Sequence, residues 1–159
     1  MRLKLTKSDI FLETTGWLLV FAVWVFIIAV FESLPDIIPI HYNAQGTPDN
    51  FGNKWMILAL PIVSTILFIG LTILNYFPET FNYPVKINEE NALKQYRYAT
   101  RLIRYLKLVI VIIFGLVLYQ TTRFSKTNNE GLGIWFLPLV LGLIFIPLIF
   151  YIIKSVKTK

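Results

Sequence analysis

The chain has 159 residues, enough for one domain, and 56% of them are hydrophobic while only 15% are charged. Ordinary soluble domains carry roughly 25% charged residues, so this composition excludes a water-soluble domain of this size. The formal net charge is +6, but the basic residues stand at the ends of apolar runs, which favours anionic lipid headgroups over nucleic acid as the counter-charge. Because the chain has one His and lacks Cys, disulfides, thiolate chemistry and multi-His metal sites are excluded.

Four apolar stretches are long enough to cross a bilayer, which takes about 20 residues of helix. They predict an all-α integral membrane protein with one domain and spans at about 12–32, 55–76, 102–122 and 132–153. The first span follows a basic start, as a signal peptide would. Its apolar run is longer than a signal peptide needs, and no cleavage site precedes Glu32. We therefore expect an uncleaved helix.

Lys and Arg are divided unevenly among the predicted connections. Twelve of the fifteen lie at the two termini or between the second and third spans: Arg2, Lys4, Lys7, Lys86, Lys94, Arg97, Arg101, Arg104, Lys107, Lys154, Lys157 and Lys159. Only Lys54, Arg123 and Lys126 lie in the other two connections. The positive-inside rule then predicts that both termini and the middle connection face the cytoplasm.

The middle connection contains a helix signal of its own. Asn88 is suited to cap a helix, and no Pro or Gly interrupts the chain from there to Phe114, so we expect a cytoplasmic helix that continues into the third span. Four basic residues share one face of it: Lys94, Arg97, Arg101 and Arg104. We expect this face to lie near anionic lipid headgroups; docking of an acidic partner is the alternative. Leu102 to Lys107 read as a snorkelling lead-in to the span.

No charged residue or His stands in the middle of a predicted span. Ion-coupled and proton-coupled transporters usually keep an ionisable side chain within the membrane, so this absence counts against a transporter. The chain also lacks a nucleophile elbow, an HExxH motif and a phosphate-binding loop. We therefore expect no enzyme and no cofactor.

The external connection 34–54 is the densest polar segment, LPDIIPIHYNAQGTPDNFGNK. Turn-forming residues alternate there with apolar ones, which predicts an ordered cap rather than a flexible linker. The residues expected to bind a ligand or partner are Asp36, His41, Asn43, Gly46, Pro48, Asp49 and Lys54. Whether the loop binds a metal stays open. Glu32, Asp36, His41, Asn43 and Asp49 could hold a divalent cation; alternatively, the two Asp residues cap turns and His41 bonds within the loop.

The same loop carries a resemblance to a known family. Leu34-Pro35-Asp36, Ile38-Pro39-Ile40-His41-Tyr42-Asn43, Gly46-Thr47-Pro48-Asp49 and Lys54 resemble the signature of a bacterial membrane family, the domain of unknown function 1648. The resemblance covers about 20–67, in which the His and Asn are characteristic. Its best-understood relatives are the SdpI-type proteins, which protect a cell from a secreted toxic peptide and signal its presence. The resemblance thus implies a bacterial cytoplasmic membrane protein whose partner is a peptide toxin or an envelope protein.

Three functions follow from these observations. The first is an immunity or sensor protein that meets an envelope-active peptide at the external loop. The alternatives are a structural or assembly subunit of a membrane complex and a small transporter. The resemblance favours the first.

Overall fold

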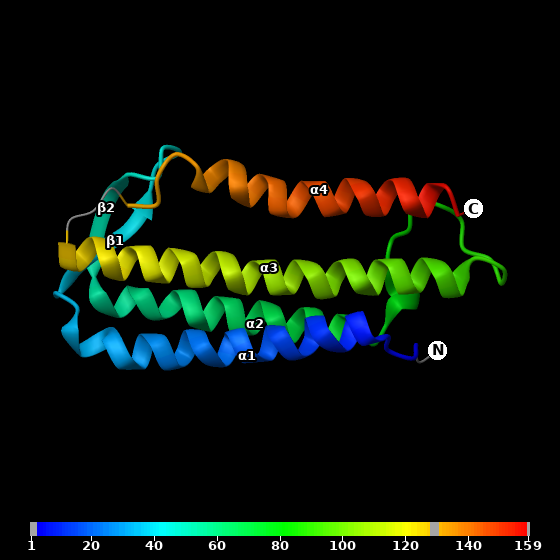
Figure 1. The fold of residues 1–159 in the computed structure, drawn as a ribbon, viewed down its shortest axis with the longest axis horizontal. Helices are drawn as coiled ribbons and strands as arrows, with labels where there is room; N and C mark the ends of the chain where they lie inside the picture. The colour runs from blue at the N-terminus through cyan, green and yellow to red at the C-terminus, as the bar shows by residue number, and fades with distance from the viewer. Residues whose placement is uncertain (1–2, 128–130, 159) are drawn as a thin grey trace.

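The computed structural model describes residues 3–127 and 131–158, and four long helices lie side by side in it (Figure 1). They are α1 (Lys7–Val30), α2 (Ala59–Leu74), α3 (Ala92–Thr127) and α4 (Phe136–Val156). With their adjoining turns, all four are long and apolar enough to cross a membrane, which confirms the prediction of four candidate spans. The two chain ends lie at the same end of the bundle. Arg2 and Lys159, which were counted for the orientation, lie outside the described residues.

Helix α1 begins at a capping box. The Thr6 hydroxyl accepts a hydrogen bond from the Asp9 backbone N–H, and the Asp9 carboxylate accepts one from the Thr6 backbone. Further along, Gly16 allows α1 to approach α2 closely, because a Cβ at Gly16 would lie 2.5 Å from the Phe68 ring. Phe68 is fully buried and packs with Val20 of α1 and Val111 of α3. The core therefore lies along the line where α1, α2 and α3 meet.

Helix α4 stands apart from this core. Among the residues that the structure describes, Ser155 is the one buried residue of α4. It lies near the carboxyl end, where its hydroxyl donates to the Gln95 side chain of α3 at 2.5 Å. The Gln95 amide in turn donates to the Ser155 carbonyl at 2.9 Å. Since Gln95 is fully buried, this reciprocal pair fixes the end of α4 against α3.

The connection 34–54 forms a β-hairpin of β1 (Ile37–Tyr42) and β2 (Pro48–Asn53) at the end of the bundle opposite to the termini (Figure 1). The all-α prediction missed these strands. The signal for them was weak, because β2 is polar and β1 contains Pro39, where the antiparallel register shifts. Ile38 is nevertheless buried and packs with Ile27, Leu34, Ile57 and Leu118 in a second core cluster beneath the hairpin.

The long helix predicted to enter the third span is present as α3, which runs unbroken from Ala92 to Thr127. It begins three residues later than expected, because Asn88 as the N-cap would place the first helical residue at 89. Asn88 and Asn91 exchange backbone and side-chain hydrogen bonds of 2.9 and 3.0 Å, so both amides are used to shape the turn that precedes the helix. The side of the membrane on which this turn lies stays a prediction.

Replacing Gly46 with Ala should destabilise the hairpin. Gly46 has φ +76°, and a Cβ there would lie 2.5 Å from the Gly133 backbone. A left-handed conformation alone costs a non-glycine residue about 1–2 kcal/mol, so the melting temperature in detergent should fall. The matched control is Gly70→Ala in α2, because a Cβ at Gly70 meets no atom within 4 Å. Equal melting temperatures for the two variants would contradict the observed turn.

Candidate functional site

The turn of the hairpin is built by Asn43 and Gly46. The Asn43 side-chain oxygen accepts hydrogen bonds from the backbone N–H groups of Gln45 and Thr47, both at 3.0 Å. The Gly46 N–H donates to the Asn43 carbonyl at 2.9 Å, and Gly46 supplies the left-handed backbone. Both predicted site residues therefore serve the shape of the loop.

Two side-chain contacts join the two arms of the hairpin, one near the turn and one at the base. His41 Nδ1 lies 2.5 Å from the Asp49 carboxylate near the turn. At the base of the hairpin, Lys54 Nζ lies 3.4 Å from the Asp36 carboxylate, which is 88% exposed. Among the described residues, no group of three or more His, Cys, Asp or Glu side chains lies close enough to hold a metal ion. The structure thus brings His41 to Asp49 but gives Asp36 a separate partner.

Besides the apolar packing of Ile38, further contacts dock the hairpin on α3 and on the connection before α4. The Tyr42 hydroxyl and the Thr121 hydroxyl of α3 are 2.8 Å apart, and burial raises the pKa of the Tyr42 phenol, which therefore stays protonated. The Leu132 N–H donates to the Gly46 carbonyl at 2.8 Å, which ties the hairpin to the connection before α4. Pro48 lies against the same connection, since a Cβ at Gly131 would come 2.9 Å from its ring.

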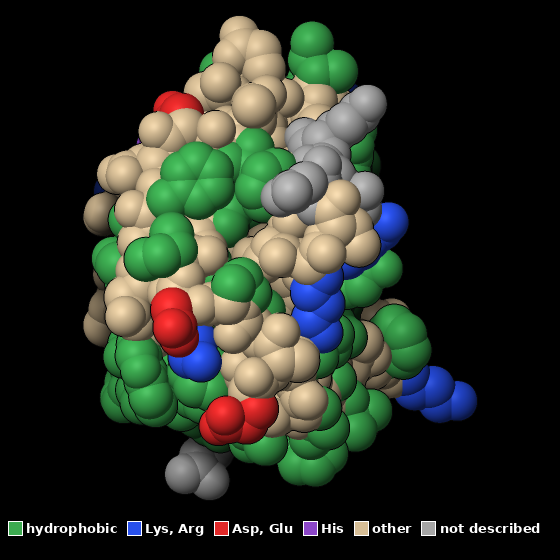
Figure 2. Space-filling view, turned by 90° about the vertical axis from the view of Figure 1, so that its left-hand side faces the viewer, with side chains coloured by type: hydrophobic (Ala, Val, Ile, Leu, Met, Phe, Trp, Pro, Cys, Tyr) green, Lys and Arg blue, Asp and Glu red, His purple; other side chains and the backbone are tan. Residues whose placement is uncertain are grey.

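The outward surface of this end is partly apolar. Ile37, Phe51 and Trp55 are 61%, 50% and 63% exposed. Figure 2, which looks onto this end, shows hydrophobic side chains interspersed with a few carboxylates and basic groups. None of the six residues of β2 is buried. The hairpin end is thus a fixed surface that offers apolar and acidic side chains to a partner.

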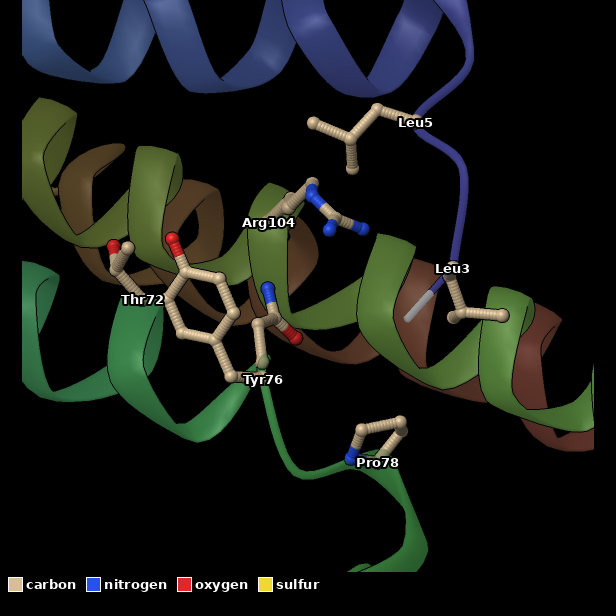
Figure 3. A pocket seen from close by; sticks show the side chains of 7 residues that line it. Leu3, Leu5, Thr72, Tyr76, Pro78 and Arg104 are labelled. Atoms are coloured by element: carbon tan, nitrogen blue, oxygen red, sulfur yellow. The ribbon is translucent and has the colours of Figure 1, made fainter. Parts of the chain in front are cut away.

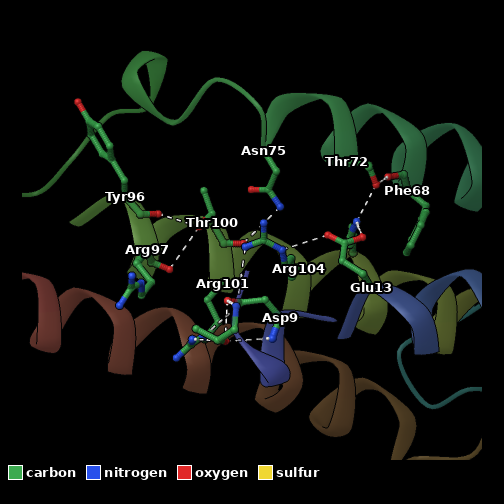
Figure 4. Close-up of polar contacts among 12 residues, drawn as sticks. Asp9, Glu13, Phe68, Thr72, Asn75, Tyr96, Arg97, Thr100, Arg101 and Arg104 are labelled. Carbon is green, nitrogen blue, oxygen red and sulfur yellow. Dashed lines mark hydrogen bonds and ion pairs between the residues drawn. The ribbon is translucent and has the colours of Figure 1, made fainter. Parts of the chain in front are cut away.

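A second polar site lies inside the bundle, toward the end that holds the termini. Asp9 and Glu13 of α1 face Arg101, Arg104 and Lys107 of α3 (Figure 4). We call these five residues the ionic cluster. It joins helices that are about 90 residues apart in the chain.

Lys107 is the most deeply placed member of the ionic cluster, with a fully buried side chain. Its ammonium group donates to the Glu13 carboxylate and to the Thr72 hydroxyl of α2, both at 2.6 Å. It also lies 4.3 Å from the centre of the Phe68 ring. Lys107 therefore contacts α1 and α2 at once.

The two arginines complete the cluster. Arg104 Nε donates to the other Glu13 oxygen at 3.1 Å. Arg101 donates to the Asp9 carboxylate and to the Thr6 hydroxyl, both at 3.0 Å. Glu13 thus pairs with two cations, whereas Asp9 also takes part in the capping box of α1.

The ionic cluster corrects two predictions. Lys107 does not snorkel to the headgroups, because Glu13 pairs with it inside the bundle. Arg104, whose side chain is 8% exposed, is likewise occupied by internal contacts and does not belong to a lipid-facing stripe. Lipid binding stays a prediction for exposed Lys94 and for the partly buried Arg97 and Arg101. The signal that was missed is charge complementarity: Asp9 and Glu13 are four residues apart on one helix, and Arg101, Arg104 and Lys107 recur at steps of three on the other.

A cavity of about 450 Å³ adjoins the ionic cluster (Figure 3). Its walls come from the N-terminal segment at Leu3 and Leu5, from Thr72 and Tyr76 of the α2 end, and from Arg104. Figure 3 shows the Arg104 guanidinium between Leu5 and Tyr76. The cavity gives this end of the bundle a hollow beside buried charges.

Glu13→Gln should destabilise the protein more than Lys107→Met. Losing Glu13 leaves two buried cations without that partner, and breaking a buried pair costs about 3–5 kcal/mol. Losing Lys107 leaves Glu13 paired with Arg104. The free energy of unfolding in mixed micelles measures both variants, with exposed Glu79→Gln as the control. A larger loss for Lys107→Met would contradict this arrangement.

The comparisons with known proteins bear on the segment that contains the hairpin. The family model described as "Domain of unknown function (DUF1648)" matches residues 18–65. An uncharacterized protein of Archaeoglobus fulgidus is 26% identical over 145 aligned residues, which cover 83% of this chain and 79% of that protein. No solved structure matches the chain. The family resemblance predicted from the loop is confirmed: the segment from α1 through the hairpin into α2 matches the DUF1648 family model.

Proposed function

We propose that this membrane protein is an immunity or sensor protein that meets an envelope-active peptide at its hairpin end. Immunity and signalling are the roles of the SdpI-type proteins, which its signature resembles. The observation that supports the proposal is the exposed apolar and acidic surface on a hairpin that is fixed to the bundle. Ile37 and Phe51 expose at least half of their area.

The docking contacts give this surface a set shape before any partner arrives. Tyr42 is bonded to α3 and Gly46 to the connection before α4. A preformed surface loses little conformational entropy on binding, so more of the contact energy appears as affinity. In this account His41, Asn43 and Gly46 keep the surface in place, and the exposed side chains contact the peptide.

The chemistry of the surface points to a cationic, amphipathic peptide. Such peptides present Lys or Arg on one face and large apolar residues on the other. Exposed Asp36 and Glu32 suit the basic face, whereas Ile37, Phe51 and Trp55 suit the apolar face. The positive-inside rule places this end outside the cytoplasm of a bacterial cell, where a secreted peptide would be met.

A small transporter is the second candidate, and the ionic cluster favours it. The argument against transport was that the spans lack an ionisable residue, yet Glu13 and Lys107 form a buried pair between α1 and α3. The cavity beside Arg104 lies next to this pair. Buried charges within a membrane commonly mark ion or proton pathways. Substrate flux in proteoliposomes that Lys107→Met abolishes would favour transport over immunity.

The proposed function predicts a separation between contact and support residues. We expect a deletion strain of the source organism to be sensitised to cationic membrane-active peptides and to be rescued by the wild-type gene. Ile37→Ser/Phe51→Ser should lower the inhibitory concentration of the peptide at least about fourfold. The reason is that two apolar contacts with the peptide, together worth roughly 1 kcal/mol or more, would be lost. The melting temperature of the protein should stay unchanged.

Asn43→Ala is the comparison variant, since it should lower protection and melting temperature together. Tyr76→Ser/Phe77→Ser, which changes exposed residues at the other end of the bundle, is the matched control. Full protection by Ile37→Ser/Phe51→Ser at normal abundance would remove the hairpin surface as the peptide contact.

A further inference from the structure

A groove of about 240 Å³ lies where α4 runs beside α1 and α3. Leu12 of α1, Arg101 and Leu102 of α3, and Pro147, Phe150 and Lys154 of α4 line it. It is separate from the hairpin and from the cavity beside Arg104, whose lining it does not share. Tyr98, Tyr105 and Tyr151 complete its walls with phenol groups.

The groove has both basic and apolar side chains in its walls. Lys154 and Pro147 are seven residues apart on α4, which is about 10 Å of helix. Lys154 lies at the end of the bundle that holds the termini, with its ammonium group 4.7 Å from the Tyr98 ring centre. Leu12, Leu102, Pro147 and Phe150 make the apolar part of the walls. The groove therefore combines basic side chains with apolar walls.

The packing of α4 explains why this groove exists. Helix α4 is joined to α3 by the Gln95–Ser155 pair near its carboxyl end, and the connection before it is joined to the hairpin through Leu132. Between these two attachments, no described residue of α4 is buried by protein. Protein side chains thus leave room between the attachments, which apolar material in a bilayer has to fill.

The basic groups of the groove outnumber the carboxylates near them. Among the described residues that line the groove, none is acidic. Asp9 pairs with Arg101, but the ionic cluster still holds three cations against two carboxylates, and Lys154 adds a further positive charge. Arg101 is 39% exposed, and its bonds to Asp9 and Thr6 use only two of the five N–H groups of its guanidinium.

We propose that this groove binds one anionic phospholipid, with the phosphate between Arg101 and Lys154 and an acyl chain along Leu102, Phe150 and Pro147. A phospholipid matches both the basic and the apolar walls of the groove, and the surrounding bilayer supplies it. Of the basic face predicted to meet lipid headgroups, only Arg101 belongs to this site. The inference does not depend on the peptide-binding proposal.

Native mass spectrometry of the purified full chain tests the site. The protein is exchanged from detergent into defined mixtures of phosphatidylglycerol and phosphatidylcholine, and the bound lipid is counted. The wild type should retain one phosphatidylglycerol in preference to phosphatidylcholine. Lys154→Gln should weaken that retention about fivefold, because one basic group near an anionic surface contributes about that factor. Lys157→Gln, a neighbouring exposed lysine that does not line the groove, is the matched control.

A second variant keeps the test independent of charge. Leu102→Trp should fill the apolar part of the groove and release lipid with either headgroup, whereas Leu93→Trp on the exposed part of α3 should not. Equal retention of the two lipids by the wild type would overturn the proposal, as would equal effects of Lys154→Gln and Lys157→Gln. Full displacement of the lipid by glycerol phosphate would also overturn it, because a free phosphate would then be the ligand.

Discussion

The contact between Glu13, Arg104 and Lys107 determines how the first three helices can be arranged. A fully buried ammonium group is tolerated only beside an anion and hydrogen-bond acceptors. Lys107 finds both, one on α1 and one on α2. Shifting any of these helices along its axis would leave a buried charge without its partner. The ionic cluster therefore sets the register in which Gly16 meets Phe68. The apolar core alone would allow many such registers, because its residues are alike.

The hairpin depends on that arrangement. Its docking partner Thr121 lies on the same helix as Lys107, about 20 Å away along α3 at the helical rise of 1.5 Å per residue. The DUF1648 signature describes this part of the fold: Asn43 and Gly46 make the turn, Pro48 and Gly46 rest on the connection before α4, and the His41–Asp49 and Lys54–Asp36 contacts join the two arms. The signature residues thus specify the shape of the hairpin. The exposed apolar residues between them are free to suit the partner.

The sequence predicted the four helices because long apolar runs are the strongest signal in a chain, and it predicted an ordered loop because turn formers alternate with apolar residues there. It did not predict the strands, since β2 has little apolar patterning. Nor did it predict the ionic cluster: Glu13 and Lys107 stand near span ends, where each alone is expected to reach water. The two side chains become buried only because α1 packs against α3 and brings them together. Such pairing between helices is not visible in the local periodicity of the sequence.

We predict from the distribution of Lys and Arg that the hairpin and the opposite end of the bundle, which holds the termini, lie on different sides of the membrane, with the hairpin outside. Because the chain lacks Cys, a single introduced thiol reports its own side. Phe51→Cys on the hairpin and Glu79→Cys near the opposite end are both exposed positions. When intact cells are treated with a membrane-impermeant maleimide, we expect the thiol at position 51 to be labelled at once. The thiol at position 79 should be labelled only after the cells are lysed. Labelling of position 79 but not 51 in intact cells would contradict it.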